Sequence, residues 1–465
     1  MLRRERLHPA AQDRLAGYLS DTGVRTTRFD SALCDALLHG RSADAEAVHD
    51  DLLGDFDHFT TERKRLLLDA CLAVVGAIPF DEGMRPDKIH PNSRVRWVNL
   101  IGLSLRVLIA SGLARPDLAD AAECDQLVRL LDTGPDGVWE NHMTANVLGL
   151  LAISTSTPGH RVVAEGAEQL VARQNRDGGM PAIADLAVFA SGPAGLALAR
   201  AGAEPDLLQR MGDYLERQQL PDGGWPFGEG TSQSDVDTTS YATAFLAVAD
   251  PVRHRSCLDR AGRYLAGMAG LDGGLPTYVA GDPPEVGMTA GATCALGFLP
   301  QRHADLLGRS ANFLLKAQRP DGTFERSWSL SESNTIWRTM WALRSLPHPQ
   351  ASNLDHEIQR ARNRSLGFLR SAQNDDGGWG YRPGDPSDTA STAYSLLALS
   401  AIDEQAEVIR RGITHLLRRQ ESDGGYTALP DQVAPRPLLF DAPVFADIWA
   451  LLALTGNGRP FQDRL

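Results

Sequence analysis

The sequence predicts an all-α protein in which pairs of helices close into an α/α barrel. From about residue 130 onward a turn containing Asp-Gly recurs, and successive copies lie roughly 40–55 residues apart, the range of helical-pair repeats. Each turn follows an amphipathic segment and precedes, after a short loop, an almost wholly apolar one. One half-exposed helix and one fully apolar helix per unit imply two concentric layers, with the apolar helices inside.

The repeated turn usually carries a Gln three residues before its Asp. Its glycines permit the positive φ angles that a tight link between two helices requires. The copies with Gln lie at 174–179, 219–225, 318–322, 373–379 and 420–426, and two copies without it lie at 135–139 and 271–274.

The composition describes a globular, acidic protein. Its 465 residues are enough for two domains or for one large domain with an ample core. The net charge of −13 argues against nucleic acid as a partner, because phosphate binding needs a positive surface. No run of 18 apolar residues occurs, so we expect no stable membrane insertion. The five cysteines have neither disulfide nor zinc spacing, which favours a reduced, cytoplasmic location.

The segment before the repeats is also helical in pattern. Residues 1–60 are charged, whereas 64–77 and 97–113 are apolar and predict buried helices. The polar connection between these two helices contains several basic residues, among them Arg94 and Arg96.

Two carboxylates stand out at Asp235 and Asp237, between the 219–225 turn and an apolar run. Thr238 and Thr239 follow them directly. A Ser/Asp cluster before an apolar run predicts a helix N-terminus, where backbone N–H groups and the helix dipole favour negative charge. Two interpretations follow from the residues alone. The carboxylates are helix caps, or they form an acid pair that retains one proton near neutral pH, because neighbouring carboxylates resist double ionisation.

The repeats and the acid stretch resemble a known enzyme superfamily. The Gln…Asp-Gly-Gly-Trp turn resembles the QW motif of squalene–hopene cyclases and of class II diterpene cyclases. The stretch 235–240 is similar to their Asp-x-Asp-Asp-Thr-Ala acid motif, with Thr238 in place of the last Asp, and this Asp-x-Asp-Thr-Thr form is associated with some drimane-forming cyclases. The segments 326–331 and 337–339 resemble bacterial members, and the resemblance spans about residues 60–465.

The resemblance implies a double α/α-barrel, the βγ-didomain architecture of these terpene cyclases. We place the inserted γ domain at 41–184 and the β domain at 185–465, with residues 1–40 as N-terminal helices that join the β domain. The active site is then expected between the two domains.

The resemblance also implies the reaction. A class II cyclase, an isomerase, protonates the terminal alkene of a linear prenyl diphosphate, here farnesyl or geranylgeranyl diphosphate. The product is a bicyclic drimane- or labdane-type diphosphate. By this resemblance Asp237 is the acid, and Asp235, Thr238 and Thr239 hold its proton in one geometry. The small isoprenoid diphosphate is the expected partner of a monomer or homodimer.

Carbocation intermediates need an apolar wall with π-faces, and the retained diphosphate needs cations. The expected magnesium ligands are Asp120 and Glu123, and the basic candidates for the diphosphate are Arg94, Arg96 and Arg161. The family's His–Asn deprotonating pair is not recognisable, and Ser191 takes the place of its histidine. The aromatic candidates for the wall are Trp225, Tyr241, Trp328, Trp337, Trp341, Trp379, Tyr381 and Phe440.

Other interpretations compete with a prenyl diphosphate cyclase. Protein prenyltransferase β-subunits share the barrel but need a zinc site, and no ligand spacing near Cys294 provides one. Polysaccharide-active α/α barrels use separated acid pairs and leave the 235/237 spacing unexplained. A squalene-type triterpene cyclase needs a membrane-facing apolar surface. A non-catalytic, prenyl-binding barrel would use both aspartates as caps.

Overall fold

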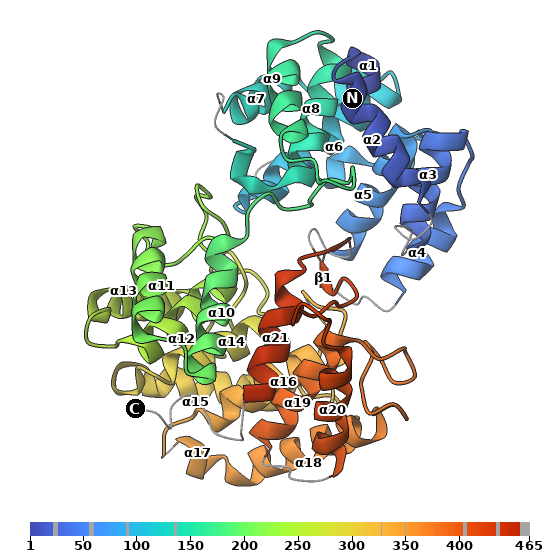
Figure 1. Ribbon diagram of the computed structural model, residues 1–465. Helices are drawn as coiled ribbons and strands as arrows, with labels where there is room; N and C mark the ends of the chain where they lie inside the picture. The colour runs from blue at the N-terminus through green and yellow to red at the C-terminus, as the bar shows by residue number, and fades with distance from the viewer. Residues whose placement is uncertain are drawn as a thin grey trace. The chain divides into compact units, whose positions relative to one another are not determined.

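The computed structural model is helical and divides into two compact units, Met1–Asp185 and Leu186–Leu465 (Figure 1). None of the helices in the described part of the chain is long and apolar enough to cross a membrane. Pro135 and Asp136 of one repeated turn, and Ser327, lie outside the described residues. The structure describes residues 1–21, 27–54, 60–89, 93–133, 137–326, 328–348, 350–402, 407–433 and 438–455.

The first unit is built around two apolar helices, α6 (Arg96–Gly112) and α8 (Met143–Ser156), which pack on each other and are buried over most of their length. Short 3-10 segments at Pro86–Lys88, Pro116–Leu118 and Trp139–Asn141 link its helices. The other helices of this unit are α1 (Leu2–Glu5), α2 (Pro9–Ser20), α3 (Arg28–His39), α4 (Ala45–Leu53), α5 (Thr61–Val74), α7 (Ala121–Leu131) and α9 (Arg161–Val171).

The N-terminal helices belong to this first unit, which differs from the prediction that residues 1–40 join the second domain. The reason lies in the 174–179 turn. Gln174 Nε2 donates to the carbonyl of Ala11 on α2 at 3.2 Å, and Arg14 Nε donates to Gln174 Oε1 at 2.9 Å. Glu5 accepts bonds from Ser154 Oγ and the Gly159 N–H. The border between the units falls after Asp185, one residue from the predicted border.

The second unit is a closed ring of inner helices surrounded by outer ones. Each inner helix packs on the next, and the last packs back on the first (Figure 1). A two-stranded antiparallel sheet pairs β1 (Gln432–Val433) with β2 (Leu439–Phe440). The inner helices are α10 (Ala187–Ala201), α12 (Val236–Ala249), α14 (Val286–Leu296), α16 (Glu332–Arg344), α19 (Thr389–Ala401) and α21 (Val444–Thr455). The outer helices are α11 (Pro205–Gln218), α13 (Arg255–Met268), α15 (Pro300–Ala317), α18 (Asp355–Ser371) and α20 (Glu407–Arg419), with the short α17 at Gln350–Asn353. The all-α prediction is confirmed.

The inner helices owe their close packing to small residues. Helix α12 is buried along most of its length and consists largely of Ala, Thr and Val. Two of its buried hydroxyls are satisfied within the helix, since Thr243 Oγ1 donates to the Thr239 carbonyl at 2.7 Å and Ser240 Oγ to the Val236 carbonyl at 2.6 Å. An outer helix such as α11 buries only one side, because the rest of its surface is charged.

The repeated turn fastens each outer helix to the next one. Gln219 Nε2 donates to the Gly223 carbonyl at 2.8 Å and to the Cys257 carbonyl on α13 at 3.0 Å. Gly223 has φ +94°, and a Cβ placed there would lie 2.7 Å from the carbonyl oxygen of Arg260. Glycine is therefore required both by the backbone angle and by the close approach of α13.

Candidate active site

Asp235 caps the N-terminus of α12. Its Oδ1 accepts the Thr238 N–H at 2.7 Å, and its Oδ2 accepts the Thr238 hydroxyl at 2.8 Å. Its own N–H donates to the Trp225 carbonyl at 3.0 Å, which joins the helix start to the preceding turn. Burial raises the pKa of Asp235 to about 7; the Thr238 N–H opposes this shift and the charge of Asp237 adds to it.

Asp237, two residues further on, forms an ion pair with Arg338 of α16. The Arg338 guanidinium binds both carboxylate oxygens, with 3.2 Å between Nη1 and Oδ2. The side chains of Arg338 and Asp237 are only 7% and 15% exposed. Burial opposes the charge on Arg338, but the Asp237 carboxylate outweighs it and raises the pKa of the guanidinium above its ordinary value. Arg338 also lies over the Tyr241 ring, 5.4 Å from its centroid.

Arg338 is the residue of this pair that the sequence analysis did not single out. The sequence does contain a signal for Arg338, because it is the one charged residue between Thr335 and Leu343 of α16. A buried guanidinium requires a carboxylate partner, since an unpaired buried charge is costly. The sequence alone does not say that this partner lies 101 residues earlier.

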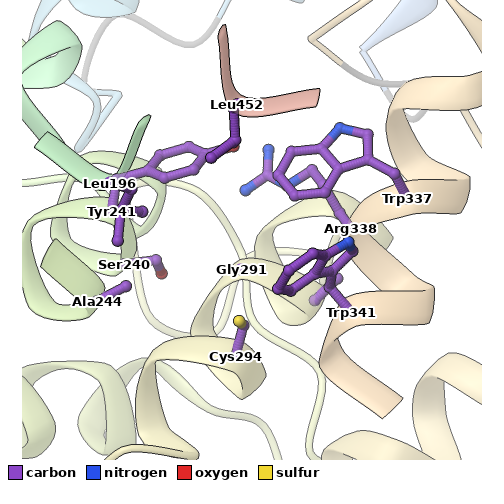
Figure 2. Close-up of a pocket in the computed structure, with 11 residues that line it drawn as sticks. Leu196, Ser240, Tyr241, Ala244, Gly291, Cys294, Trp337, Arg338, Trp341 and Leu452 are labelled. Carbon is purple, nitrogen blue, oxygen red and sulfur yellow. The ribbon is translucent and has the colours of Figure 1, made fainter. Parts of the chain in front are cut away.

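An apolar pocket adjoins the ion pair (Figure 2). Tyr241, Trp337 and Trp341 line it together with Arg338. Burial raises the pKa of the Cys294 thiol to about 11 and also raises the pKa of Tyr241, so both groups are neutral at neutral pH. The pocket thus presents π-faces and no anionic nucleophile from these two groups, which suits a carbocation. The remaining lining residues are Leu196, Ser240, Ala244, Ala290, Gly291 and Leu452.

A second pocket lies at the starts of α19 and α21, and Tyr394, Phe445 and Trp449 are among its lining residues. Trp449 connects the two pockets through ring contacts. Its ring centroid lies 5.7 Å from that of Trp337, 5.9 Å from that of Tyr241 and 5.6 Å from that of Tyr394. Tyr394 and Trp449 were not among the predicted site residues, because nothing in a fully apolar helix marks the side that faces the lumen.

Two predicted aromatic residues, Trp225 and Trp379, lie away from both pockets. Each is fully buried and donates its indole N–H to an outer helix: Trp225 to the Leu215 carbonyl at 2.6 Å and Trp379 to the Leu369 carbonyl at 2.8 Å. Their rings anchor the repeated turn, so they do not form the predicted cation wall.

The remaining predicted aromatics also lie outside the lining of both pockets. Trp328 donates its indole N–H to Glu285 Oε2 at 3.1 Å, and the Tyr381 hydroxyl donates to the Pro430 carbonyl at 2.8 Å. Phe440 lies in β2. Ser191, expected in the position of the family's histidine, donates its hydroxyl to the Ala187 carbonyl one turn earlier in α10 at 2.7 Å.

The predicted magnesium ligands, Asp120 and Glu123, both make contacts within the first unit. Asp120 caps α7 and accepts the Glu123 N–H at 2.8 Å. Glu123 is buried and accepts a bond from Arg106 Nε at 2.6 Å. Within the described ranges no third carboxylate, His or Cys completes a ligand set with these two residues. The binding of magnesium by these two residues stays a prediction.

One other cluster has the spacing of metal ligands, on the outer side of the second unit. It consists of Asp213, Glu216 and His254. Arg253 already binds Asp213 through two bonds of 2.9 and 3.0 Å, and His254 Nδ1 lies 2.9 Å from Glu216 Oε2. This cluster ties α11 to the start of α13, and we assign it no catalytic role.

The predicted diphosphate-binding arginines all lie in the first unit. Arg96 pairs with Glu140 at 2.5 Å and lies 5.3 Å from the centroid of the Trp139 ring. Arg161 pairs with Asp132 and Glu165, and Arg94 is exposed just before α6. Their role in binding a diphosphate stays a prediction.

Comparison with known proteins finds a matching family model, relatives in sequence and a neighbour in fold. The family model of the squalene–hopene cyclase C-terminal domain matches residues 206–457, just over half of the chain. A drimenyl diphosphate synthase of Streptomyces showdoensis is 37% identical over 473 residues, covering 98% of this chain and 87% of the relative. A drimenyl diphosphate synthase of Streptantibioticus cattleyicolor is 39% identical over 415 residues, covering 86% of this chain and 77% of the relative. In fold, the chain is similar to the ent-copalyl diphosphate synthase from Streptomyces platensis, with a TM-score of 0.55 and 18% identity over 98% of this chain and 100% of that one.

Proposed function

Because this chain belongs to the class II terpene cyclases of the squalene–hopene cyclase family, we propose that it converts farnesyl diphosphate into a bicyclic drimane-type diphosphate. The observation that carries the proposal is the Asp237–Arg338 pair beside an apolar, aromatic pocket. The drimane skeleton is favoured over a labdane one because the two relatives that match most of this chain are drimenyl diphosphate synthases.

In this proposal Asp237 is the general acid. The proton of its carboxyl group passes to the terminal alkene, whose π electrons form the new C–H bond and leave a tertiary cation. The carboxylate left behind is held by both bonds from Arg338 and by the N-terminal end of α12. Stabilising this anion makes the acid stronger, which an unactivated alkene requires. After ring closure the final cation gives up one proton, which leaves a C=C bond in the product, and Asp237 takes up one proton before the next cycle.

The walls of the pocket then protect the cation while the rings close. The faces of Tyr241, Trp337 and Trp341 attract positive charge, and the neutral Cys294 does not compete as a thiolate. Burial of the ion pair keeps bulk water from quenching the cation. The diphosphate takes no part in the bond changes and leaves with the product.

Product analysis tests this proposal directly. The purified protein is incubated separately with farnesyl diphosphate, geranylgeranyl diphosphate and squalene, and the extracts are analysed by mass spectrometry with and without phosphatase. We expect a new cyclic alcohol from farnesyl diphosphate after phosphatase treatment only. A hydrocarbon formed without phosphatase, with release of pyrophosphate, would contradict the retained diphosphate, and a product from squalene alone would reassign the substrate.

The cellular setting is part of the proposal. All five cysteines are free thiols, which supports a reducing compartment such as the cytoplasm. We propose a monomer or homodimer as the working form.

A further inference from the structure

We infer that Gly291 of α14 is a positioning residue: its missing side chain opens the passage through which Arg338 reaches Asp237. The inference rests on the proposed role of Asp237 as the acid. Arg338 belongs to α16 and Asp237 to α12, and α14 packs between these two helices. The guanidinium must therefore cross the inner side of α14 to form the ion pair.

The passage has no room for a side chain at position 291. A Cβ built there would lie 2.6 Å from Arg338 Nη2, closer than real Cβ contacts come (Figure 2). It would also lie 3.4 Å from the Cβ and 3.5 Å from the Oγ of Ser240, so the opposite side of the passage is occupied by α12. One turn earlier, at Gly287, a Cβ would lie 3.9 Å from Arg338 Nη1, which is an ordinary contact.

The group that would give way to a new methyl is the guanidinium. It is the far end of a flexible side chain, whereas Ser240 belongs to a packed inner helix. The guanidinium is held by both oxygens of Asp237 and lies over the Tyr241 ring. Displacing it therefore weakens the ion pair without unfolding the barrel.

Helix propensity favours alanine over glycine at position 291, so the presence of glycine there needs another reason. Glycine in a helix interior is less favourable than alanine. Gly291 lies well inside α14, its backbone angles are ordinary helical ones, and α14 contains alanine at several neighbouring positions. The methyl group alone would therefore stabilise α14, so glycine at this position serves a requirement other than helix stability.

The chemical consequence concerns the anion formed when the proton leaves. With Arg338 displaced, the Asp237 carboxylate loses its positive partner, so proton transfer to the alkene slows. The loss should therefore appear in kcat, because it concerns the proton-transfer step.

The experiment compares Gly291→Ala with Arg338→Gln, their double variant and Gly287→Ala, in steady-state kinetics and in circular dichroism. We expect Gly291→Ala to lose about a hundredfold in kcat, the scale of a displaced catalytic group, with KM near its original value and the helical circular dichroism unchanged. Gly287→Ala should retain activity. In the Arg338→Gln background, whose shorter side chain leaves room for a methyl, Gly291→Ala should cause almost no further loss.

Two results would overturn the inference. One is a Gly291→Ala enzyme with an unchanged kcat, and the other is an equal loss of kcat from Gly291→Ala in both backgrounds, which would mean that Gly291 does not act through Arg338. Either result alongside an inactive Asp237→Asn enzyme leaves the proposed function intact. A fully active Asp237→Asn enzyme would instead refute the proposed function itself.

Discussion

The N-termini of α12 and α19 have the same capping hydrogen bonds, but only that of α12 carries the proposed acid. Asp235 and Asp388 are the respective caps, and each donates its N–H to the carbonyl of a preceding Trp at 3.0 Å. Each accepts the N–H three residues later, at 2.7 Å for Asp235 and 2.9 Å for Asp388. A threonine four residues after each cap accepts the N–H of that same Trp.

The difference lies two residues after the cap. Helix α12 has Asp237 there, whereas α19 has Ala390. Burial raises the pKa of both cap residues, Asp235 and Asp388, to about 7, although α19 has no acid at the second position. The raised pKa of Asp235 is therefore a property of the buried cap in this fold. What distinguishes the α12 end is Asp237 together with the Arg338 that reaches it.

The largest expected effect is a loss of kcat that occurs on substitution of Asp237 and not of a cap residue. Asp237→Asn keeps the shape of the side chain but removes the proposed proton donor, so we expect kcat to fall by about a thousandfold, with the helical circular dichroism unchanged. Asp388→Asn is the matched control and should leave kcat near its original value, because Asn also caps helices well. Comparable losses of kcat in the two variants would indicate a structural effect and not the loss of a proton donor.

A smaller effect concerns stability and should be shared by the two caps. Each carboxyl has a folded-state pKa of about 7, above its ordinary value of 3.8. The folded protein therefore binds more protons than the unfolded chain in this range, so this contribution to stability is full below pH 3.8 and is lost as pH rises through 7. Asp235→Asn and Asp388→Asn should each flatten the fall of the unfolding free energy over this range, measured by urea titration at several pH values. If only Asp388→Asn did so, Asp235 would have to be ionised in the folded protein.

The smallest effect tests the two threonines. Thr239 Oγ1 accepts the Trp225 N–H at 2.9 Å, and Thr392 Oγ1 accepts the Trp379 N–H at 3.0 Å. Thr239→Val and Thr392→Val each leave a buried N–H without this partner, so both should cost about 1–3 kcal/mol of unfolding free energy. A clearly larger cost at Thr239 would show that the hydroxyl does more at the α12 end than anchor the turn.

The sequence predicted those parts of the site that depend on local chemistry. The helix start at Asp235 followed from an acidic and hydroxyl cluster before an apolar run, and the layered helix pairs followed from the repeated turn. We predicted that Trp225 and Trp379 line the cation wall, because the sequence does not show in which direction an aromatic side chain points. They point to the outer helices, because their indole N–H groups find carbonyls there.

The unpredicted parts depend on contacts across the ring. Arg338 meets Asp237 only after α12, α14 and α16 have packed side by side. The wholly apolar inner helices have no amphipathic stripe, so periodicity could not show that Tyr394 and Trp449 line a pocket. The position of residues 1–40 depends likewise on bonds to the distant 174–179 turn.

Closure of the ring between α10 and α21 also determines when the pocket exists. Leu196 of α10 and Leu452 of α21 line the same pocket, although they come from the first and last inner helices of the unit. While α21 is still inside the ribosome during synthesis, the acid and most of the pocket wall can already be in place, but the ring is open where α21 will pack. A carbocation formed there would meet water. The enclosed cavity therefore forms only after α21 has packed against α10 and closed the ring.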